Sequence, residues 1–428
     1  MKQIKQIIIF GILFFLVSCA IPQPIQTSES TPNGSAISGV ATEKATLPSK
    51  IIAPTDAQAV ITAVTQIAGQ EINISKLTMV NTLDGWAWAA NTTNSTILVR
   101  TSDGANTWMD VSPPDEYRIT NSSFIGSQNA WLTVLDLKEN WGVLSTSDGG
   151  ASWNLLPSFD PIKGANVTFL NEKVGFAEIA DIGAGNAYIR QYETADGGQT
   201  WSLLPLISPD SGANLSEGTI HLCNICGDVL YTDMERAMII KGEMANEPSG
   251  IVNIAYSSDR GFNWSNSSVS LPEEYKNGNI APFMPKFDGS QGVLPINVTK
   301  SKDDGSLEFS MLFIYQTTDN GSTWQLQDSR LNVGAVYLET PQYASSKDIF
   351  VRCADGLCYT NDAGATFVVN PSSLHFGFNA PQADYVSNFQ FVTSQNGFAV
   401  VGAETASQVW VTNDFGVQWS RLQPRLLP

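Results

Sequence analysis

The chain has 428 residues, of which 43% are hydrophobic, and 41 acidic against 23 basic side chains give it a formal net charge of −18. This length exceeds one ordinary compact core, whereas the apolar fraction is that of a globular protein. The negative charge argues against nucleic acid or anionic lipid as the main partner, because both are polyanions that attract basic surfaces.

Residues 1–19 have the pattern of an export signal. Lys2 and Lys5 precede an apolar run from Ile7 to Val17, which is short for a membrane span. The run ends in Leu16-Val17-Ser18-Cys19, which resembles a bacterial lipobox. The resemblance implies lipid attachment at Cys19. It also implies a place in the cell envelope, on the extracytoplasmic side, with the lipid anchor as the sole membrane contact.

Residues 20–55 are rich in Ser, Thr, Pro, Ala and Gly and contain few large apolar side chains, which predicts a disordered tether. We assign residues 56–428 to the folded domain. Its first residues, 56–70, fit a short helix or an opening strand equally well.

The domain repeats a short motif seven times, Ser/Thr-x-Asp-x-Gly-x-x-Trp, with Ala105 at the glycine position of the first copy and Phe367 at the tryptophan position of the sixth. An Asp side chain can accept hydrogen bonds from main-chain N–H groups just ahead of it, and Gly supplies the positive φ that a tight hairpin needs. The final aromatic residue starts the next strand with a large surface to bury. The aspartates are Asp103, Asp148, Asp196, Asp259, Asp319, Asp362 and Asp414, and the aromatic residues are Trp108, Trp153, Trp201, Trp264, Trp324, Phe367 and Trp419.

This motif resembles the Asp-box, or bacterial neuraminidase repeat, which joins the third and fourth strands of β-propeller blades. The longer context is similar to the propellers of photosystem II stability and assembly factors. It is carried by Gly85-Trp86-Ala87-Trp88 followed by Ile97-Leu98-Val99-Arg100-Thr101, and by Gly397-Phe398-Ala399-Val400 in the last repeat. The resemblance covers residues 72–424.

We therefore predict an all-β fold, a seven-bladed β-propeller of four-stranded antiparallel blades. The approximate blades are 72–114, 118–157, 163–207, 219–272, 280–328, 336–371 and 385–424. Because blade 7 has an outer strand of its own, an additional closing strand from the N-terminus is possible but not required.

The long connections point to a candidate binding face. In such blades, the loops between strands two and three and between blades lie opposite the Asp-boxes, and the extra length falls there in blades 3 to 6. Binding residues concentrate on loops held by a rigid scaffold, although tolerated insertions without a role explain the length equally well. The candidate residues are Asn186, Lys300, Lys302, His375, Phe376 and Phe378.

Four cysteines besides Cys19 suggest disulfides in an oxidising compartment. Cys353 and Cys358 flank an Asp-Gly turn, which predicts that they face each other across a hairpin. Cys223 and Cys226 form a Cys-x-x-Cys pair without the βαβ pattern of a redox site, so we expect a local structural disulfide.

A catalytic constellation is not evident. Sialidases, which share the Asp-box, are known for an Arg cluster and a Tyr nucleophile paired with Glu; the nearest motif, Tyr117-Arg118-Ile119-Thr120, lacks the expected Pro. His221 sits in a strand-like pattern, and no calcium loop or phosphate loop appears. We expect no catalytic residue, metal or cofactor.

The sequence thus predicts a lipid-anchored propeller that acts as a non-enzymatic scaffold or assembly factor for an envelope or membrane protein. The assembly factors are known for a basic patch, and this acidic chain shows no such cluster. The alternative is a carbohydrate-binding protein or a sialidase-like glycoside hydrolase.

Overall fold

The computed structural model describes residues 69–428, except 91–95, 160–163, 184–185, 205–219, 223–228, 232–235, 241–248, 261–262, 335–338, 355, 378–383 and 403–406. The predicted signal segment, Cys19, the tether and the Cys223/Cys226 pair lie outside these residues. The described part forms seven β-sheets and a 3-10 helix, η1 (Glu273–Tyr275). No described helix is long and apolar enough to cross a membrane.

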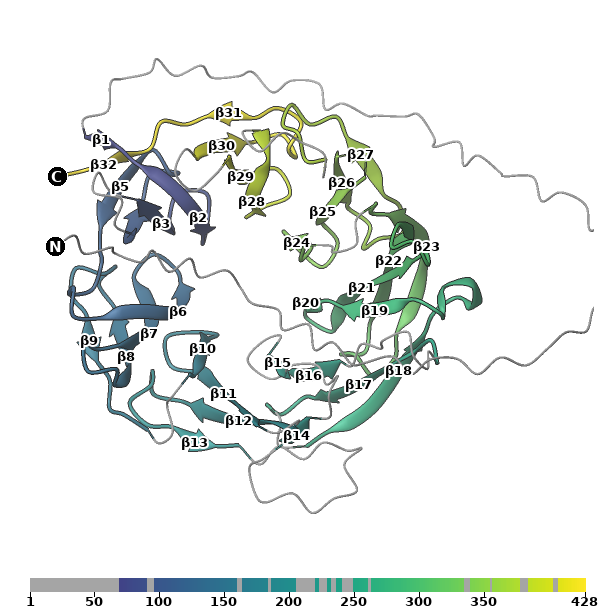
Figure 1. Cartoon of the computed structure of the whole chain (residues 1–428), viewed down its shortest axis with the longest axis horizontal. Coiled ribbons are helices and arrows are strands. Elements are labelled where there is room, and N and C mark those ends of the chain that lie inside the picture. The colour runs from purple at the N-terminus through teal and green to yellow at the C-terminus, as the bar shows by residue number, and fades with distance from the viewer. Residues whose placement is uncertain are drawn as a thin grey trace, which may run out of the picture. The chain divides into compact units, whose positions relative to one another are not determined.

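The seven sheets follow one another as the blades of a propeller (Figure 1), which confirms the predicted fold class. Blade 1 consists of β2 (Asn73–Met79), β3 (Gly85–Ala90), β4 (Thr96–Thr101) and β5 (Thr107–Asp110). Blade 2 consists of β6 (Arg118–Ile125), β7 (Asn129–Leu135), β8 (Trp141–Thr146) and β9 (Asn154–Leu155). Blade 3 consists of β10 (Asn166–Phe169), β11 (Gly175–Gly183), β12 (Asn186–Thr194), β13 (Ser202–Leu203) and the added β14 (Ile220–Leu222).

The remaining blades repeat the antiparallel order. Blade 4 consists of β15 (Val229–Tyr231), β16 (Ala237–Ile240), β17 (Ile251–Ser257) and β18 (Ser265–Ser270). Blade 5 consists of β19 (Asn279–Pro282), β20 (Lys286–Asp288), β21 (Gln291–Ser301), β22 (Leu307–Thr317) and β23 (Gln325–Asn332). Blade 6 consists of β24 (Gln342–Tyr343), β25 (Ile349–Cys353), β26 (Gly356–Thr360) and β27 (Val368–Asn370). Blade 7 consists of β28 (Val386–Phe391), β29 (Gly397–Val401), β30 (Gln408–Thr412) and β31 (Ser420–Arg421).

One predicted blade boundary is wrong. The span 219–272 was expected to form blade 4, but β14, which contains His221, pairs with β12 of blade 3. Blade 4 begins only at β15. A strand of three residues, Ile220-His221-Leu222, is too short to reveal from sequence which of two neighbouring sheets it joins.

The core lies between neighbouring blades. The second and third strands are covered on both faces, which explains why six of the seven residues of β7 are buried in a nearly continuous apolar run. Trp86 and Leu98 of blade 1 share a cluster with Leu132 and Leu144 of blade 2. Between blades 6 and 7, the rings of Phe350 and Phe391 stack with their centroids 3.5 Å apart. Each blade therefore depends on its neighbours for burial.

The seven repeats form one turn, here called the Asp turn, from the Ser/Thr to the aromatic residue. In the second copy, the Thr146 hydroxyl donates to Asp148 Oδ1 (2.7 Å), and the main-chain N–H of Ser152 donates to the same oxygen (3.0 Å). The Thr146 hydroxyl also accepts from the N–H of Gly150 (2.9 Å). All seven copies have the first two bonds. The predicted acceptor role of the aspartate is thus observed, and the Ser/Thr adds a second acceptor.

The glycine of the Asp turn has two roles. Its φ is positive, for example 86° at Gly364, and a Cβ there would lie 2.6 Å from Cβ of Ile314 in the preceding blade. The first copy departs from the pattern, since Ala105 stands at this position, with φ 69° and full burial. Glycine is therefore required where blades approach closely, and alanine replaces it beside the ring closure.

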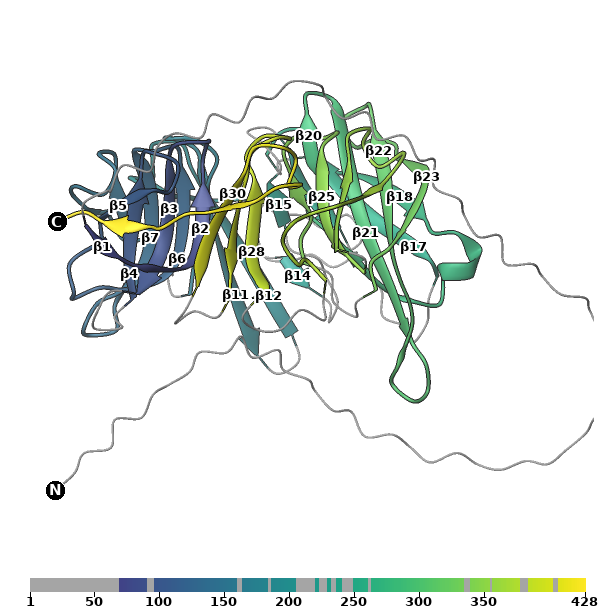
Figure 2. The ribbon, with the colours of Figure 1, turned by 90° about the horizontal axis from the view of Figure 1, so that it is seen from above.

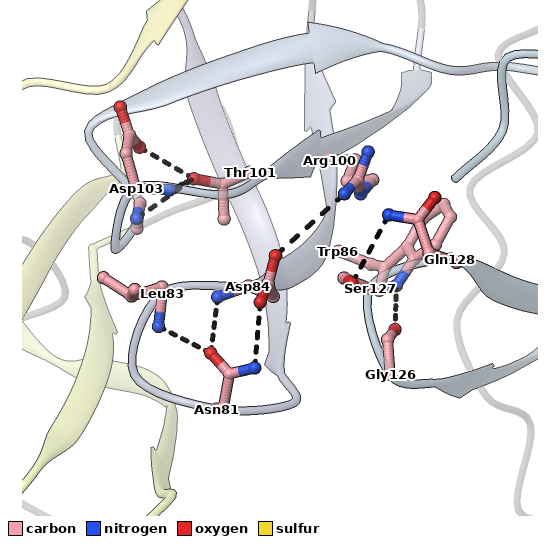
Figure 3. Close-up of polar contacts among 11 residues, drawn as sticks. Asn81, Leu83, Asp84, Trp86, Arg100, Thr101, Asp103, Gly126, Ser127 and Gln128 are labelled. Carbon is pink, nitrogen blue, oxygen red and sulfur yellow. Dashed lines mark hydrogen bonds and ion pairs between the residues drawn. The ribbon is translucent and has the colours of Figure 1, made fainter. Parts of the chain in front are cut away.

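In six of the seven blades, a main-chain hydrogen bond joins the Asp turn to the turn between the first and second strands of the same blade; the corresponding turn of blade 4, residues 232–235, lies outside the described residues. In blade 1, the N–H of Gly104 donates to the carbonyl of Leu83 (2.9 Å), and Figure 3 shows Asp103 and Thr101 beside the turn that contains Asn81 and Asp84. Equivalent bonds occur in blades 2, 3, 5, 6 and 7. These turns share one side of the propeller, here called the turn face.

The ring closes across blade 1. β32 (Arg425–Leu426) leaves blade 7 and pairs in parallel with β5, and β1 (Gln70–Glu71) then pairs antiparallel with the outer edge of β32. The sheet of blade 1 therefore has six strands, in the order β1-β32-β5-β4-β3-β2 (Figure 1). As expected, blade 7 keeps an outer strand of its own, β31; the closing strands extend blade 1.

Candidate binding face

The side opposite the turn face carries the connections between second and third strands and between blades; we call it the loop face. Two hairpins extend from it: β11–β12, with nine residues in each strand, and β21–β22, with eleven in each. Figure 2 shows both hairpins reaching beyond the other strands at the same rim. The β21–β22 hairpin is here called the arm.

The base of the arm is braced by the connection between blades 4 and 5. The ring of Tyr275, in η1, packs edge-on against Phe309 and Phe313, with centroid distances of 5.2 and 5.0 Å. Arg330 lies over the Tyr275 ring (5.7 Å) and forms an ion pair with Glu274. The arm thus projects from a packed aromatic base.

The tip of the arm is polar and exposed. Lys300 Nζ lies 3.0 Å from Glu308 Oε2 across the hairpin, so its charge is paired, whereas Lys302 is exposed. The Ser306 hydroxyl and main-chain N–H both donate to Asp304, and these bonds lower the pKa of its carboxyl. Residues 300–308 therefore present a mixture of charges, two basic and three acidic side chains.

The crossing from blade 6 to blade 7 differs from the expectation. His375 is exposed, but Phe376 is only 1% exposed and packs edge-on against Phe389. Phe376 belongs to the core between the two blades, so it does not lie on a binding face. The sequence of the connection, Leu374-His375-Phe376-Gly377-Phe378, does not show which of its apolar side chains enters the core. Phe378 and the Asn186 side chain lie outside the described part of the chain.

Next to Phe376 lies a polar cluster that the sequence did not reveal. Arg352, in β25, is 1% exposed, and its guanidinium donates to the main-chain carbonyls of Phe376 and Val386. Its Nη2 lies 3.3 Å from Glu339 Oε2, and the guanidinium lies 4.7 Å from the centre of the Tyr385 ring. The Tyr385 hydroxyl donates to Glu339 Oε1 (3.0 Å).

The cluster joins the beginnings of two blades. Glu339 precedes β24, the innermost strand of blade 6, and Tyr385 directly precedes β28, the innermost strand of blade 7. Burial raises the pKa of Tyr385, the charge of Arg352 opposes this, and Glu339 reinforces it, so the hydroxyl stays protonated and can act as a donor. Because both blades begin at the loop face, the cluster lies on that side of the molecule.

A disulfide lies next to the cluster. Cys353 and Cys358 are bonded and both are buried. The strand register differs from the expectation, because Cys353 is opposite Gly356 and Cys358 is opposite Val351. The two cysteines are therefore a diagonal pair on one face of the hairpin, with Cα atoms 5.9 Å apart.

The residue types of the cluster bear on the enzymatic alternative. A Tyr hydrogen-bonded to a Glu near an Arg is the kind of group sought for sialidase-like chemistry, but the cluster holds a single Arg, bonded to two carbonyls and a carboxylate. Arg118 is exposed in β6, far along the chain from these residues. Among the described residues, no group of three His, Cys, Asp or Glu side chains is placed to hold a metal ion.

No protein-family model matches the chain, and no curated protein matches it either. Three solved structures illustrate its structural similarities. YCF48 bound to a D1 peptide matches with 16% identity and a TM-score of 0.46, over 80% of this chain and 94% of that one. A polysaccharide lyase, the PL25 ulvan lyase, matches with 11% identity and a TM-score of 0.44, over 72% and 84%.

The third is the β-propeller domain of the Trilobed protease from Pyrococcus furiosus, with 8% identity and a TM-score of 0.47, over 83% of this chain and 96% of that one. Similarities of this size carry no information about function.

Proposed function

We propose that this protein is a non-enzymatic scaffold, anchored by lipid at Cys19 on the extracytoplasmic side of a membrane, and that it binds an envelope or membrane protein through its loop face. The observation that carries the proposal is the contrast between the two faces. The turn face consists of short turns bonded to one another, whereas the loop face carries the braced arm, the β11–β12 hairpin and the long crossing before β28.

The arm is the strongest part of this argument. The tip of this hairpin, residues 301–306, is exposed and adds no burial, yet Tyr275 and Arg330 support its base. Because the exposed segment is held rigidly, less conformational entropy is lost when a partner binds to it. Because the tip carries side chains of both signs, it suits a partner with a polar protein surface better than a partner with a purely anionic surface.

The experiment is affinity capture from native membranes with the full-length protein and two variants. In the first, residues 301–308 are replaced by Asn-Gly, which joins the paired residues Lys300 and Phe309 by a two-residue turn and keeps Phe309 against Tyr275. In the second, the control, Leu83→Ser changes an exposed side chain on the turn face. We expect a stoichiometric protein partner with the wild type and the control and its loss with the shortened arm, while both variants keep the wild-type unfolding temperature.

If the variant with the shortened arm still captures the same partner, the proposal that binding occurs through the loop face is wrong. A glycan-related role is the second candidate, because Tyr385, Glu339 and Arg352 lie together. Fluorogenic glycosides test it: turnover that disappears in Tyr385→Phe would favour the enzyme over the scaffold.

A further inference from the structure

The carboxylate of Glu339 is held in the manner of a bound ligand. One oxygen accepts from the Tyr385 hydroxyl at 3.0 Å, and the other lies 3.3 Å from Nη2 of Arg352. A guanidinium and a hydroxyl directed at the two oxygens of one carboxylate form a typical donor set for that group.

The donors are held in place by groups other than Glu339. Main-chain carbonyls of Phe376 and Val386 accept from the guanidinium of Arg352, and its central carbon lies over the Tyr385 ring. Because these partners belong to the backbone and core of two blades, the donors keep their positions when the carboxylate leaves.

Glu339 is the exposed member of the ion pair. Its side chain is 41% exposed, whereas that of Arg352 is 0% exposed. It also lies outside a strand, three residues before β24 begins. A buried cation is costly without a counter-ion, so the site favours a carboxylate. Within the ion pair, solvent reaches Glu339 far more easily than Arg352.

We propose that Arg352 and Tyr385 form a binding site for a carboxylate group, and that Glu339 occupies this site until a ligand carboxylate replaces it. The ligand class is a monocarboxylate, whether the C-terminus of a polypeptide or an acidic sugar. Glu339 competes as a tethered group with a high effective concentration, so small carboxylates bind weakly to the wild type. This proposal is independent of the scaffold function, because it concerns only the replacement of the Glu339 carboxylate by a ligand carboxylate.

The test is chemical rescue in the intact protein. Glu339→Ala should lower the unfolding temperature in chloride, and sodium acetate should restore it with saturation, by roughly 2 °C at ten times the dissociation constant. Sodium chloride at equal ionic strength should not. Glu308→Ala, which removes an ion-paired carboxylate on the arm, is the matched control and should show no acetate effect. Adding Tyr385→Phe to Glu339→Ala should weaken the rescue.

If acetate raises the unfolding temperature of both alanine variants equally, or of neither variant, the proposed carboxylate site is wrong. If Glu339→Ala does not fold, Glu339→Gln keeps the side-chain volume, and line broadening of carbon-13 acetate should exceed that with the wild type; equal broadening overturns the proposal. An acetylated dipeptide, which carries a peptide C-terminus, and glucuronate, an acidic sugar, are then compared with acetate on Glu339→Ala. The ligand class that the site recognises should restore the unfolding temperature at a lower concentration than acetate does. If neither compound acts at a lower concentration than acetate, the site does not recognise either class of ligand.

Discussion

Leu426 of β32 is the parallel-strand partner of Trp108, the residue that ends the first Asp turn. The N–H of Leu427 donates to the carbonyl of Trp108 (2.8 Å), and the Trp108 side chain is fully buried. The last residues of the chain therefore cover the first blade at the point where an outer strand would otherwise present an open edge.

Ending the chain at Gln423 should open this closure. We expect a loss of about 2–3 kcal/mol, because the burial of one large apolar side chain and several main-chain hydrogen bonds disappear. Thermal unfolding should show the loss, and tryptophan emission should shift to longer wavelength as Trp108 meets water. A chain that ends at Leu427 keeps the hydrogen bond to Trp108 and should match the wild type; an equal loss there would contradict the role of β32.

Gly364→Ala should destabilise the protein by about 2–3 kcal/mol. The new Cβ would meet the branched side chain of Ile314 at 2.6 Å, in a backbone conformation with φ 86°. Gly305→Ala is the matched control, because φ there is 81° but nothing lies within 4 Å of the new atom. Denaturant unfolding of the two variants separates the clash from the backbone strain, and equal losses would show that the close approach to Ile314 has no cost.

The Asp turns should give the protein a specific sensitivity to acid. Hydrogen bonds from Ser152 and Thr146 lower the pKa of Asp148 from 3.8 to about 2. A lowered pKa stabilises the folded state above about pH 4, and this contribution is lost as the pH falls toward 2. Asp148→Asn should therefore unfold at a lower temperature than the wild type at pH 6, and the two should converge near pH 2.

The control for this experiment is Asp115→Asn, an exposed aspartate, which should follow the wild type at every pH. A difference between Asp148→Asn and the wild type that does not shrink on acidification would mean that the turn does not depend on the charge.

Replacing Cys353 and Cys358 by alanine should cost about 2 kcal/mol, the estimate for opening a short covalent loop in the unfolded chain. The expected readout is a lower unfolding temperature, and dithiothreitol should bring the wild type to the same value. The neighbouring Arg352 should stay in place, so the acetate response of Glu339→Ala should survive in the triple variant. Insensitivity of the wild type to complete reduction would contradict the prediction.

The repeated turn made the fold predictable. Its Asp, Gly and aromatic residues act within eight consecutive positions, so local chemistry alone identifies the hairpin, and seven copies specify the number of blades. The pairing of the turns with the first loops of the blades followed from the same topology.

The candidate site was not predictable in this way. Glu339, Arg352 and Tyr385 belong to no motif, and they meet because two neighbouring blades begin at the same face. The sequence left the mode of ring closure open for a similar reason. Arg425 and Leu426 form a strand of two residues, which is too short to show a periodic pattern. Their partners, Thr107 and Trp108, lie at the other end of the folded chain and are brought to them only when the ring closes.

The position of β1 has a mechanical consequence. β1 is the outermost strand of blade 1 and is joined by two residue pairs to β32, the strand that closes the ring. A force applied to the residues before Gly69 therefore acts first on this short ladder, and next on the strand that keeps blades 1 and 7 together. If the chain is held at its N-terminal end, that tension is transmitted directly to the closure of the propeller.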